Sequence, residues 1–408
     1  MEASFVGILI VMVVAFLAPL AIGFRPGLRL PSVVLEIVVG IVIGPSILGW
    51  VEVDEVIEIL ALIGLAFLLF LAGLEIDVHG LRGMRLKLAA AGFAVSFGIA
   101  LIVGSGLDMA GLVGDGLFTA IVFAATSLGI VIPILKDAGE VGSSFGQLVI
   151  AGASIADFAT VILLSLFFSG EEASLGSTLV ILGGLLVLAV LLIVVVRRAE
   201  MWRPLSAVLL RLQDTTAEIR VRGAFLFLIA WVALVTELGL EVILGAFVAG
   251  AILTLIDGDE MLTHPHFREK LEAAGYGFFV PVFFITSGLR FNLDALLEEP
   301  STIALAPIFV AGLLLIRGLP ALLYRHQVGR RLAGVAALLQ STSLPFIVAS
   351  AMIGLDLGVV TEATASAMIA AGLLSVLIFP ITASTLLKRG TSQGSVSTGP
   401  ADVQPSPG

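Results

Sequence analysis

The chain contains no cysteine among its 408 residues and carries little charge of either sign. Without cysteine it has no disulfide, no thiolate metal site and no cysteine nucleophile. Lys, Arg, Asp and Glu make up 13% of the residues, about half the share found in a typical soluble domain. The net charge is -10, and no stripe of basic residues supports binding to nucleic acid.

Most of the remaining residues are apolar, and they gather in long runs. Hydrophobic residues make up 59% of the chain, and a run of about 20 of them is long enough to span a bilayer. Charges, glycine and proline bound these runs, so we predict an all-α membrane protein with 13 transmembrane helices in a lipid bilayer. The predicted spans are 3–22, 32–49, 57–75, 88–104, 116–135, 145–168, 176–196, 223–239, 241–256, 271–289, 302–324, 332–354 and 361–387.

The basic residues indicate which side of the membrane each connection faces. An odd number of spans places the termini on opposite sides. With the N-terminus outside, all of the 21 Lys and Arg residues except Arg290 and Arg317 fall in cytoplasmic connections. Such a bias is the positive-inside rule, and we expect an outer N-terminus and a cytoplasmic C-terminus.

One carboxylate, Asp157, stands in the middle of the sixth predicted span. A charge at that depth costs roughly 2.5–3.5 kcal/mol or more on insertion scales. Beside it we expect the run 118–135, which is interrupted by Thr126 and Ser127 and then by Gly129 and Pro133. A broken helix next to a buried acid indicates an ion site. The alternative is that the two hydroxyls bond to their own helix and that the proline is only a kink.

Short internal similarities indicate two related halves. The paired segments are 70–74 with 285–289, 126–128 with 342–344, and Gly40 with Gly250. We predict inverted repeats over about 30–168 and 240–388, joined by 169–239. A second broken span falls in the second half, at Gln340, Ser341, Thr342, Ser343 and the following residues through Pro345. Broken helices at corresponding positions point to a substrate site near the membrane midplane.

Two further segments are predicted outside the spans. Apolar residues recur every three or four positions in 197–222, which predicts an amphipathic helix at the membrane interface. We assign 1–389 to the transmembrane domain. The remaining residues, 390–408, are rich in Gly, Ser, Pro and Thr, and we expect a disordered cytoplasmic tail.

Several motifs resemble those of a known family. The motifs are Leu30-Pro31-Ser32 followed by Glu36, Gly40, Gly44-Pro45 and Leu48-Gly49; Phe70-Leu71-Ala72-Gly73-Leu74-Glu75; Thr126-Ser127; and Phe145-Gly146-Gln147 leading to Asp157. Together they resemble the Kef-type, sodium/hydrogen exchanger-like branch of the monovalent cation:proton antiporter superfamily. The resemblance covers most of residues 28–388.

The resemblance implies a fold, an assembly and roles for particular residues. It implies the sodium/proton antiporter fold, with two crossed discontinuous helices in a six-helix core domain, and a homodimer in the plasma (inner) membrane of a prokaryote. Asp157 takes the place of the essential ion- and proton-binding aspartate. Arg317 stands where the family usually has a lysine or arginine. Ala156 departs from the pattern, because family members usually have Asp, Asn or Gln there.

Three candidate site residues have open alternatives. Ser154 shares a helical face with Asp157 and either supplies an oxygen to the ion or bonds to a backbone carbonyl. Arg317 either pairs with Asp157 or extends toward the inner membrane surface. Glu36 either lines the ion path or faces a hydrated vestibule.

We therefore expect a secondary-active antiporter that exchanges a monovalent cation, Na⁺ or K⁺, for protons by alternating access, and not an enzyme. Asp157 would bind either a proton or a cation, with oxygens from Thr126, Ser127 and Ser154. One carboxylate carries one proton or one cation, so exchange should be electroneutral. No cofactor is expected, and no metal beyond the transported cation. The alternative is a transport-silent membrane sensor or receptor that retains the fold.

Overall fold

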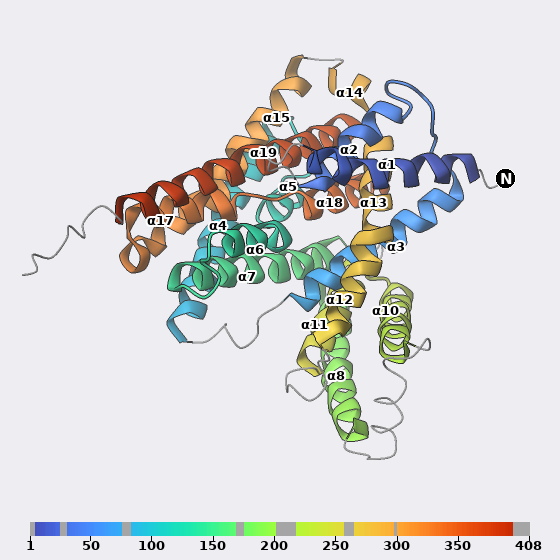
Figure 1. Cartoon of the computed structure of the whole chain (residues 1–408), viewed down its shortest axis with the longest axis horizontal. Helices are drawn as coiled ribbons and strands as arrows, with labels where there is room; N and C mark the ends of the chain where they lie inside the picture. The colour runs from blue at the N-terminus through green and yellow to red at the C-terminus, as the bar shows by residue number, and fades with distance from the viewer. Residues whose placement is uncertain are drawn as a thin grey trace, which may run out of the picture.

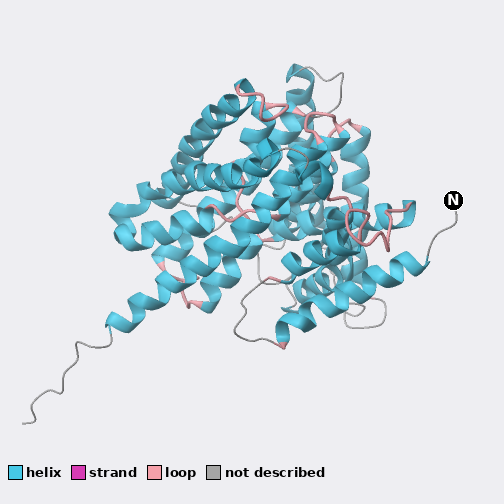
Figure 2. Cartoon of the chain, turned by 90° about the horizontal axis from the view of Figure 1, so that it is seen from above, coloured by secondary structure: helices cyan, strands magenta, loops and turns pink. Residues whose placement is uncertain are grey.

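The computed structural model describes residues 5–24, 31–75, 83–168, 175–200, 218–256, 265–297 and 300–394. Within these ranges every regular element is a helix, as Figure 2 shows. The prediction of an all-α protein is confirmed. Most of the predicted interfacial helix, 201–217, lies outside the described residues. The last helix continues to Gly394, five residues into the predicted tail, and 395–408 lie outside the description.

The first half of the chain forms the following helices. They are α1 (Phe5–Gly23), α2 (Ser32–Ile43), α3 (Glu55–Leu74), α4 (Gly83–Met109), α5 (Gly116–Phe123), α6 (Leu128–Asp137), α7 (Ser144–Phe167) and α8 (Leu175–Glu200). Asp54 begins α3, Asp115 begins α5 and Ser143 begins α7, each by accepting a backbone N–H in the first turn.

The second half contains more irregular helices. They are α10 (Ile219–Glu237), α11 (Val242–Ile256), α12 (Pro265–Ala274), η1 (Gly275–Phe279), α13 (Val280–Leu289), α14 (Leu293–Leu297), α15 (Pro300–Leu313), η2 (Leu314–Gly318), α16 (Leu319–Ala321), η3 (Leu322–Tyr324), α17 (Arg325–Gln340), α18 (Pro345–Asp356) and α19 (Glu362–Gly394). The elements η1 and η2 are π-helical turns, which often mark functional positions. Within α17, Gly329 has a φ of +81°, which only glycine adopts readily.

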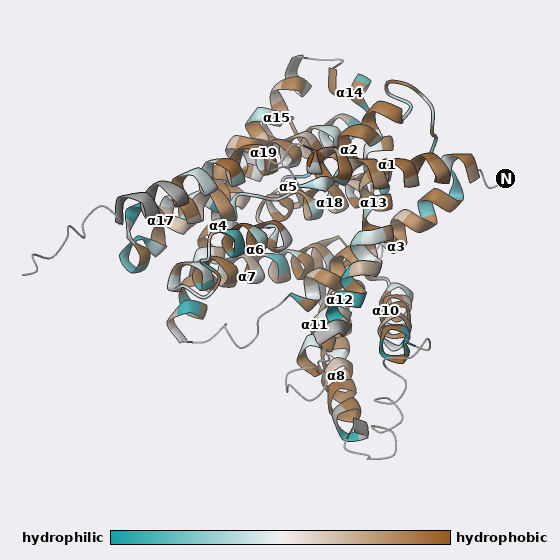
Figure 3. Cartoon of the chain, viewed as in Figure 1, coloured by the Kyte–Doolittle hydropathy of each residue, from teal (hydrophilic) through white to brown (hydrophobic). Residues whose placement is uncertain are grey.

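The described helices are long and apolar enough for a multi-pass membrane protein. Ten segments of at least 18 residues qualify as candidate spans by length and hydropathy. One of them, Thr302–Asp356, contains two predicted spans, and the shorter apolar helices Ser32–Ile43 and Val242–Ile256 correspond to two more. Figure 3 shows apolar residues along most of each ribbon, with polar residues concentrated toward helix ends. Large apolar side chains on α1 and α8 are exposed, as expected of surfaces that face lipid.

The helices form two groups that pack mainly within themselves. In one group α4, α5, α6 and α7 pack with α15 through α19, and in the other α1, α2 and α3 pack with α10 through α13. Figure 1 shows α4, α6, α7, α17 and α19 running together, while α10, α11 and α12 lie in the other part of the molecule. Asp157 lies on α7, in the first group.

Two glycine pairs bring helices of the second group into backbone contact. Gly40 of α2 faces Gly288 of α13, and Gly73 of α3 faces Gly250 of α11. A Cβ atom on any of these four glycines would collide with a backbone carbonyl of the opposite helix. Small residues permit such close crossings in membrane helices, where packing contributes much of the association energy. The second group is therefore held together at two backbone crossings.

Candidate ion-binding site

A cavity of about 230 Å³ lies between the two groups of helices. The first group contributes residues of α6, α7 and α18, and the second contributes residues of α2, α3, α11, η1 and α13. Much of the lining is apolar. The polar lining includes Glu36, Glu75, Thr126, Ser127, Asp157 and Tyr276. Three carboxylates thus share one cavity.

The chain leaves the helical conformation between α5 and α6, and this interruption is next to Asp157. Asp157 is half-buried near the middle of α7. Its Oδ2 accepts a hydrogen bond from the backbone N–H of Leu128, the first residue of α6, at 3.4 Å. The N-terminus of a helix carries partial positive charge, which stabilises a carboxylate there. The Ser127 side chain forms no capping bond to α6 and lines the cavity.

Thr126 connects this interruption to the one between α17 and α18. Its hydroxyl donates to the carbonyl oxygen of Gln340 at 2.7 Å and accepts from Nε of Arg317 at 2.8 Å. One residue later, the backbone N–H of Ser127 donates to the carbonyl oxygen of Thr342 at 2.9 Å. Three backbone groups that the interruptions free from helical bonding, the carbonyls of Gln340 and Thr342 and the N–H of Ser127, thus find partners in contacts between the two interruptions.

Arg317 lies on η2 and its side chain is only 1% exposed, which rules out an extension to the membrane surface. Its two terminal nitrogens donate to Oγ of Ser96 at 3.2 Å and to the carbonyl oxygen of Gly152 at 3.4 Å. Among the described residues it forms no ion pair with a carboxylate. The expected direct pair with Asp157 is therefore absent. The guanidinium donates its hydrogen bonds to neutral oxygens instead, including the Thr126 hydroxyl.

The structure places the polar residues of the second interruption away from the cavity. Gln340, Ser341, Thr342 and Ser343 are all buried, and none of them lines the cavity. The hydroxyls of Ser341 and Thr342 donate to carbonyls four residues earlier in α17, at 2.7 and 3.1 Å. The hydroxyl of Ser343 is buried without a partner in the described part of the chain. Instead, α18 contributes apolar side chains to the cavity.

Ser154 does not reach the cavity either, although it lies one turn before Asp157. Its hydroxyl is buried without a hydrogen-bond partner among the described residues, so neither expected role is seen. Ala156 is fully buried, and its carbonyl accepts from the Thr160 hydroxyl at 2.8 Å. Glu36 is buried on α2 and lines the cavity.

Sequence reasoning missed three polar residues that line the cavity, Ser32, Glu75 and Tyr276, and the last two matter most here. Glu75 is the C-cap residue of α3, and Tyr276 lies in the π-helical turn η1. Glu75 ends the motif that carried the family resemblance, and Tyr276 is one of only two tyrosines in the chain. Both signals were available, but they did not indicate that the two residues meet at one cavity.

The sequence of this chain is similar to those of known membrane transporters. Residues 12–389 match the family described as sodium/hydrogen exchanger, transmembrane. The chain is 30% identical over 405 residues to the putative Na⁺/H⁺ antiporter YjbQ of Bacillus subtilis, covering 95% of this chain and 64% of that protein. It is 28% identical over 397 residues to the probable Na⁺/H⁺ antiporter 3 of Methanocaldococcus jannaschii, covering 93% and 96% of the two chains.

A solved structure has a similar fold. The sodium proton antiporter MjNhaP1 from Methanocaldococcus jannaschii at pH 8 matches with a TM-score of 0.69 and 19% identity, over 94% of this chain and 98% of that chain. At this identity the likeness concerns the fold alone. The sequence matches are to antiporters, which are secondary transporters and not enzymes. The family match covers nearly the whole described chain, and the protein belongs to the sodium/hydrogen exchanger family of the monovalent cation:proton antiporter superfamily.

Proposed function

We propose that this protein exchanges a monovalent cation, Na⁺ or K⁺, for protons across the membrane. The observation that carries the proposal is the position of Asp157, whose carboxylate lies at a helix N-terminus and lines a cavity between two groups of helices. The names of the relatives, which include a Na⁺/H⁺-K⁺ antiporter of Bacillus cereus, support this choice.

The chemistry rests on competition for one carboxylate. A proton and a cation both neutralise Asp157, and neither binds well while the other is present. The Ser127 hydroxyl does not cap α6 and lines the cavity, so it can ligate a cation. Thr126 fixes the position of the interruption, whose backbone carbonyls can supply further oxygens. The buried positive charge of Arg317 acts through space as a fixed counter-charge for Asp157.

Alternating access follows if one group of helices moves relative to the other. The glycine crossings support inverted repeats over about 30–168 and 240–388. The predicted repeat pairs Gly40 with Gly250 and the helix of Gly73 with that of Gly288. The crossing of Gly40 with Gly288 in one half therefore corresponds to the crossing of Gly250 with Gly73 in the other. We propose that all 13 predicted spans cross the membrane and that the second group forms the fixed part.

Several finer features belong to the same proposal. Exchange is one for one and electroneutral, the N-terminus is outside, and the protein resides in the plasma (inner) membrane of a prokaryote as a homodimer. The positive-inside distribution supports the orientation. A transport-silent sensor with the same fold is disfavoured, because such a protein has no need for a carboxylate that lines a cavity.

The test is a pH-gradient assay on purified protein in proteoliposomes, with NaCl, KCl and LiCl in turn. We expect the wild type to collapse the gradient with at least one salt. Asp157→Asn should lose at least 100-fold in rate and retain its melting temperature, because an amide cannot alternate between proton and cation. Full exchange by a folded Asp157→Asn protein would reject the proposal.

Electroneutrality needs its own measurement. A potassium-valinomycin potential is imposed while Na⁺ drives the pH change, and the Na⁺ gradient that balances a fixed pH gradient is found. We expect the balance point to stay constant with voltage. Each net charge moved would change the balance by about 2.3 kcal/mol per 100 mV.

A further inference from the structure

We propose that Glu75, the Tyr276 hydroxyl and the first turn of α6 at Gly129 form a second monovalent-cation site, which loads the ion before it reaches Asp157. This inference rests on the proposed exchange of a monovalent cation. It assigns a function to the end of the cavity that is built by the C-terminus of α3. The basic residues that follow α3, Arg85 and Lys87, place this end on the cytoplasmic side in the topology above.

Glu75 has a buried oxygen without a protein donor. Its Oε2 is inaccessible to solvent and has no hydrogen-bond partner in the described part of the chain. A buried carboxylate oxygen without a partner is costly, and the cost is removed when a cation or a proton binds. Because Glu36 and Asp157 share the cavity, negative charge accumulates there unless a positive ion enters.

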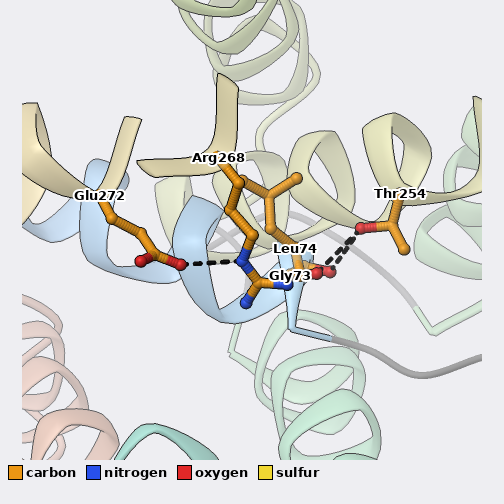
Figure 4. Close-up of polar contacts among 5 residues, drawn as sticks. All are labelled: Gly73, Leu74, Thr254, Arg268 and Glu272. Carbon is orange, nitrogen blue, oxygen red and sulfur yellow. Dashed lines mark hydrogen bonds and ion pairs between the residues drawn. The ribbon is translucent and has the colours of Figure 1, made fainter. Parts of the chain in front are cut away.

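The nearby fixed cation is already engaged. Figure 4 shows Arg268 on α12 turned to Glu272, to which its Nε donates at 2.8 Å. The same view shows the end of α3, where the Thr254 hydroxyl donates to the carbonyl oxygen of Leu74 at 3.2 Å. The C-terminal end of a helix carries partial negative charge and attracts cations. Glu75 thus stands at a cation-attracting position and forms no ion pair among the described residues.

Gly129 leaves space for an ion beside both side-chain oxygens. A Cβ atom added at Gly129 would lie 3.9 Å from Oε2 of Glu75 and 3.9 Å from the hydroxyl oxygen of Tyr276. Both atoms therefore border the same small volume. Carboxylate and hydroxyl oxygens suit hard cations. An alanine methyl group would fit there at ordinary contact distance, so it would exclude the ion without disturbing the fold.

The site adds a step to transport and leaves the stoichiometry unchanged. The ion moves from Glu75 to the Asp157 carboxylate, whose backbone donor Leu128 is the residue before Gly129. Only Asp157 exchanges the cation for a proton. Glu75 then captures the cation from the cytoplasmic side only. Its substitution should weaken cation uptake from that side and leave uptake from the other side unchanged.

Transport from each side tests this asymmetry. Glu75→Gln and Gly129→Ala are compared with Gly98→Ala, a helical control in α4 with nothing within 4 Å of the added methyl. In oriented vesicles, we expect the apparent KM for cytoplasmic Na⁺ to rise about tenfold in the first two variants and to stay unchanged in the control. The KM for Na⁺ on the other side should not move. Unchanged cytoplasmic KM values, or a lower maximal rate alone, would overturn the site.

Binding provides a readout that does not require transport. Purified Asp157→Asn protein is titrated with NaCl and followed by ²³Na NMR, with choline chloride as the reference salt. We expect Na⁺ binding to persist in this variant and to disappear when Gly129→Ala or Glu75→Gln is added. Absence of Na⁺ binding to Asp157→Asn would refute the second site. A wild type that exchanges no cation would instead refute the proposed function.

Discussion

The interruption between α5 and α6 borders the cavity, whereas the polar residues of the interruption between α17 and α18 do not line it. Thr126 and Ser127 occupy the first interruption, and the corresponding residues of the second are Thr342 and Ser343. The Thr126 hydroxyl bonds to two other elements, while the Thr342 hydroxyl bonds only within α17. Ser127 lines the cavity and Ser343 is buried.

The difference lies in what each interruption does with its freed groups. The first turns a helix N-terminus toward Asp157. The second supplies backbone carbonyls that anchor the first, through Gln340 and Thr342. Ser375 of α19 in turn holds the second in place, because its hydroxyl oxygen accepts from the N–H of Ser343 at 3.2 Å. Its proton is shared between the carbonyl oxygens of Gly372 at 2.8 Å and Ser343 at 3.0 Å. One interruption is a binding surface and the other is its support.

Among substitutions that test this comparison, the largest effect is expected at Arg317, which donates to Thr126 from η2. Arg317→Ala removes a buried guanidinium and three hydrogen bonds. We expect exchange at neutral pH to fall at least tenfold. The pH profile of the remaining activity should shift toward alkaline values, because the Asp157 carboxylate loses a positive neighbour. Rates are measured in proteoliposomes across a pH series.

Arg317→Lys is the control for charge. It keeps the positive charge and loses the planar arrangement of donors, so its rate should fall while its pH profile stays in place. An unshifted profile in Arg317→Ala would mean that Asp157 does not sense this charge.

A matched pair of substitutions separates the two interruptions. Thr126→Val preserves shape but leaves Nε of Arg317 without its 2.8 Å acceptor, which costs about 1–3 kcal/mol. We expect a lower melting temperature in detergent and about a tenfold slower exchange. Thr342→Val removes only a bond to the preceding turn and should stay within twofold of wild type. Equal losses in both variants would contradict the division between surface and support.

The smallest effects are expected at the two serines. Ser127→Ala removes a hydroxyl that lines the cavity, so the apparent KM for the transported cation should rise about threefold. Ser343→Ala removes a hydroxyl that is buried without a partner among the described residues, so the melting temperature should stay the same or rise. Calorimetry and transport assays on both variants check this. A higher KM in Ser343→Ala would place that serine on the ion path.

The sequence was sufficient for features that depend on local composition. Long apolar runs predicted the helices, and non-helical chain is found at Thr126 and Ser127 and just before Pro345. The expected interruption at Pro133 is wrong, because Pro133 lies inside α6. A lone carboxylate in an apolar run also pointed to Asp157, because few other reasons exist to place charge there.

Features that depend on how helices pack were harder to predict from the sequence. Hydroxyls at Ser341 and Thr342 were assigned to the site, but in the structure they bond to their own helix, an option that sequence alone leaves open. Ser96 bonds Arg317 from a position 221 residues away, and nothing in its neighbourhood predicts that contact. Glu75 was seen as a motif residue and not as part of the cavity, because its location depends on where α3 ends relative to α6 and η1.

The contacts between the interruptions also bear on how the protein is made. Thr126 and its partner Gln340 are 214 residues apart, so at about 5–20 residues per second the ribosome needs roughly 10–40 s to synthesise the partner. Throughout that interval the N–H of Ser127 lacks its acceptor, the Thr342 carbonyl, and the surrounding hydrocarbon offers no other. The first half of the protein must therefore enter the membrane with a polar gap that the second half closes. Nascent chains that stop before α17 should be recognised and degraded by membrane quality control.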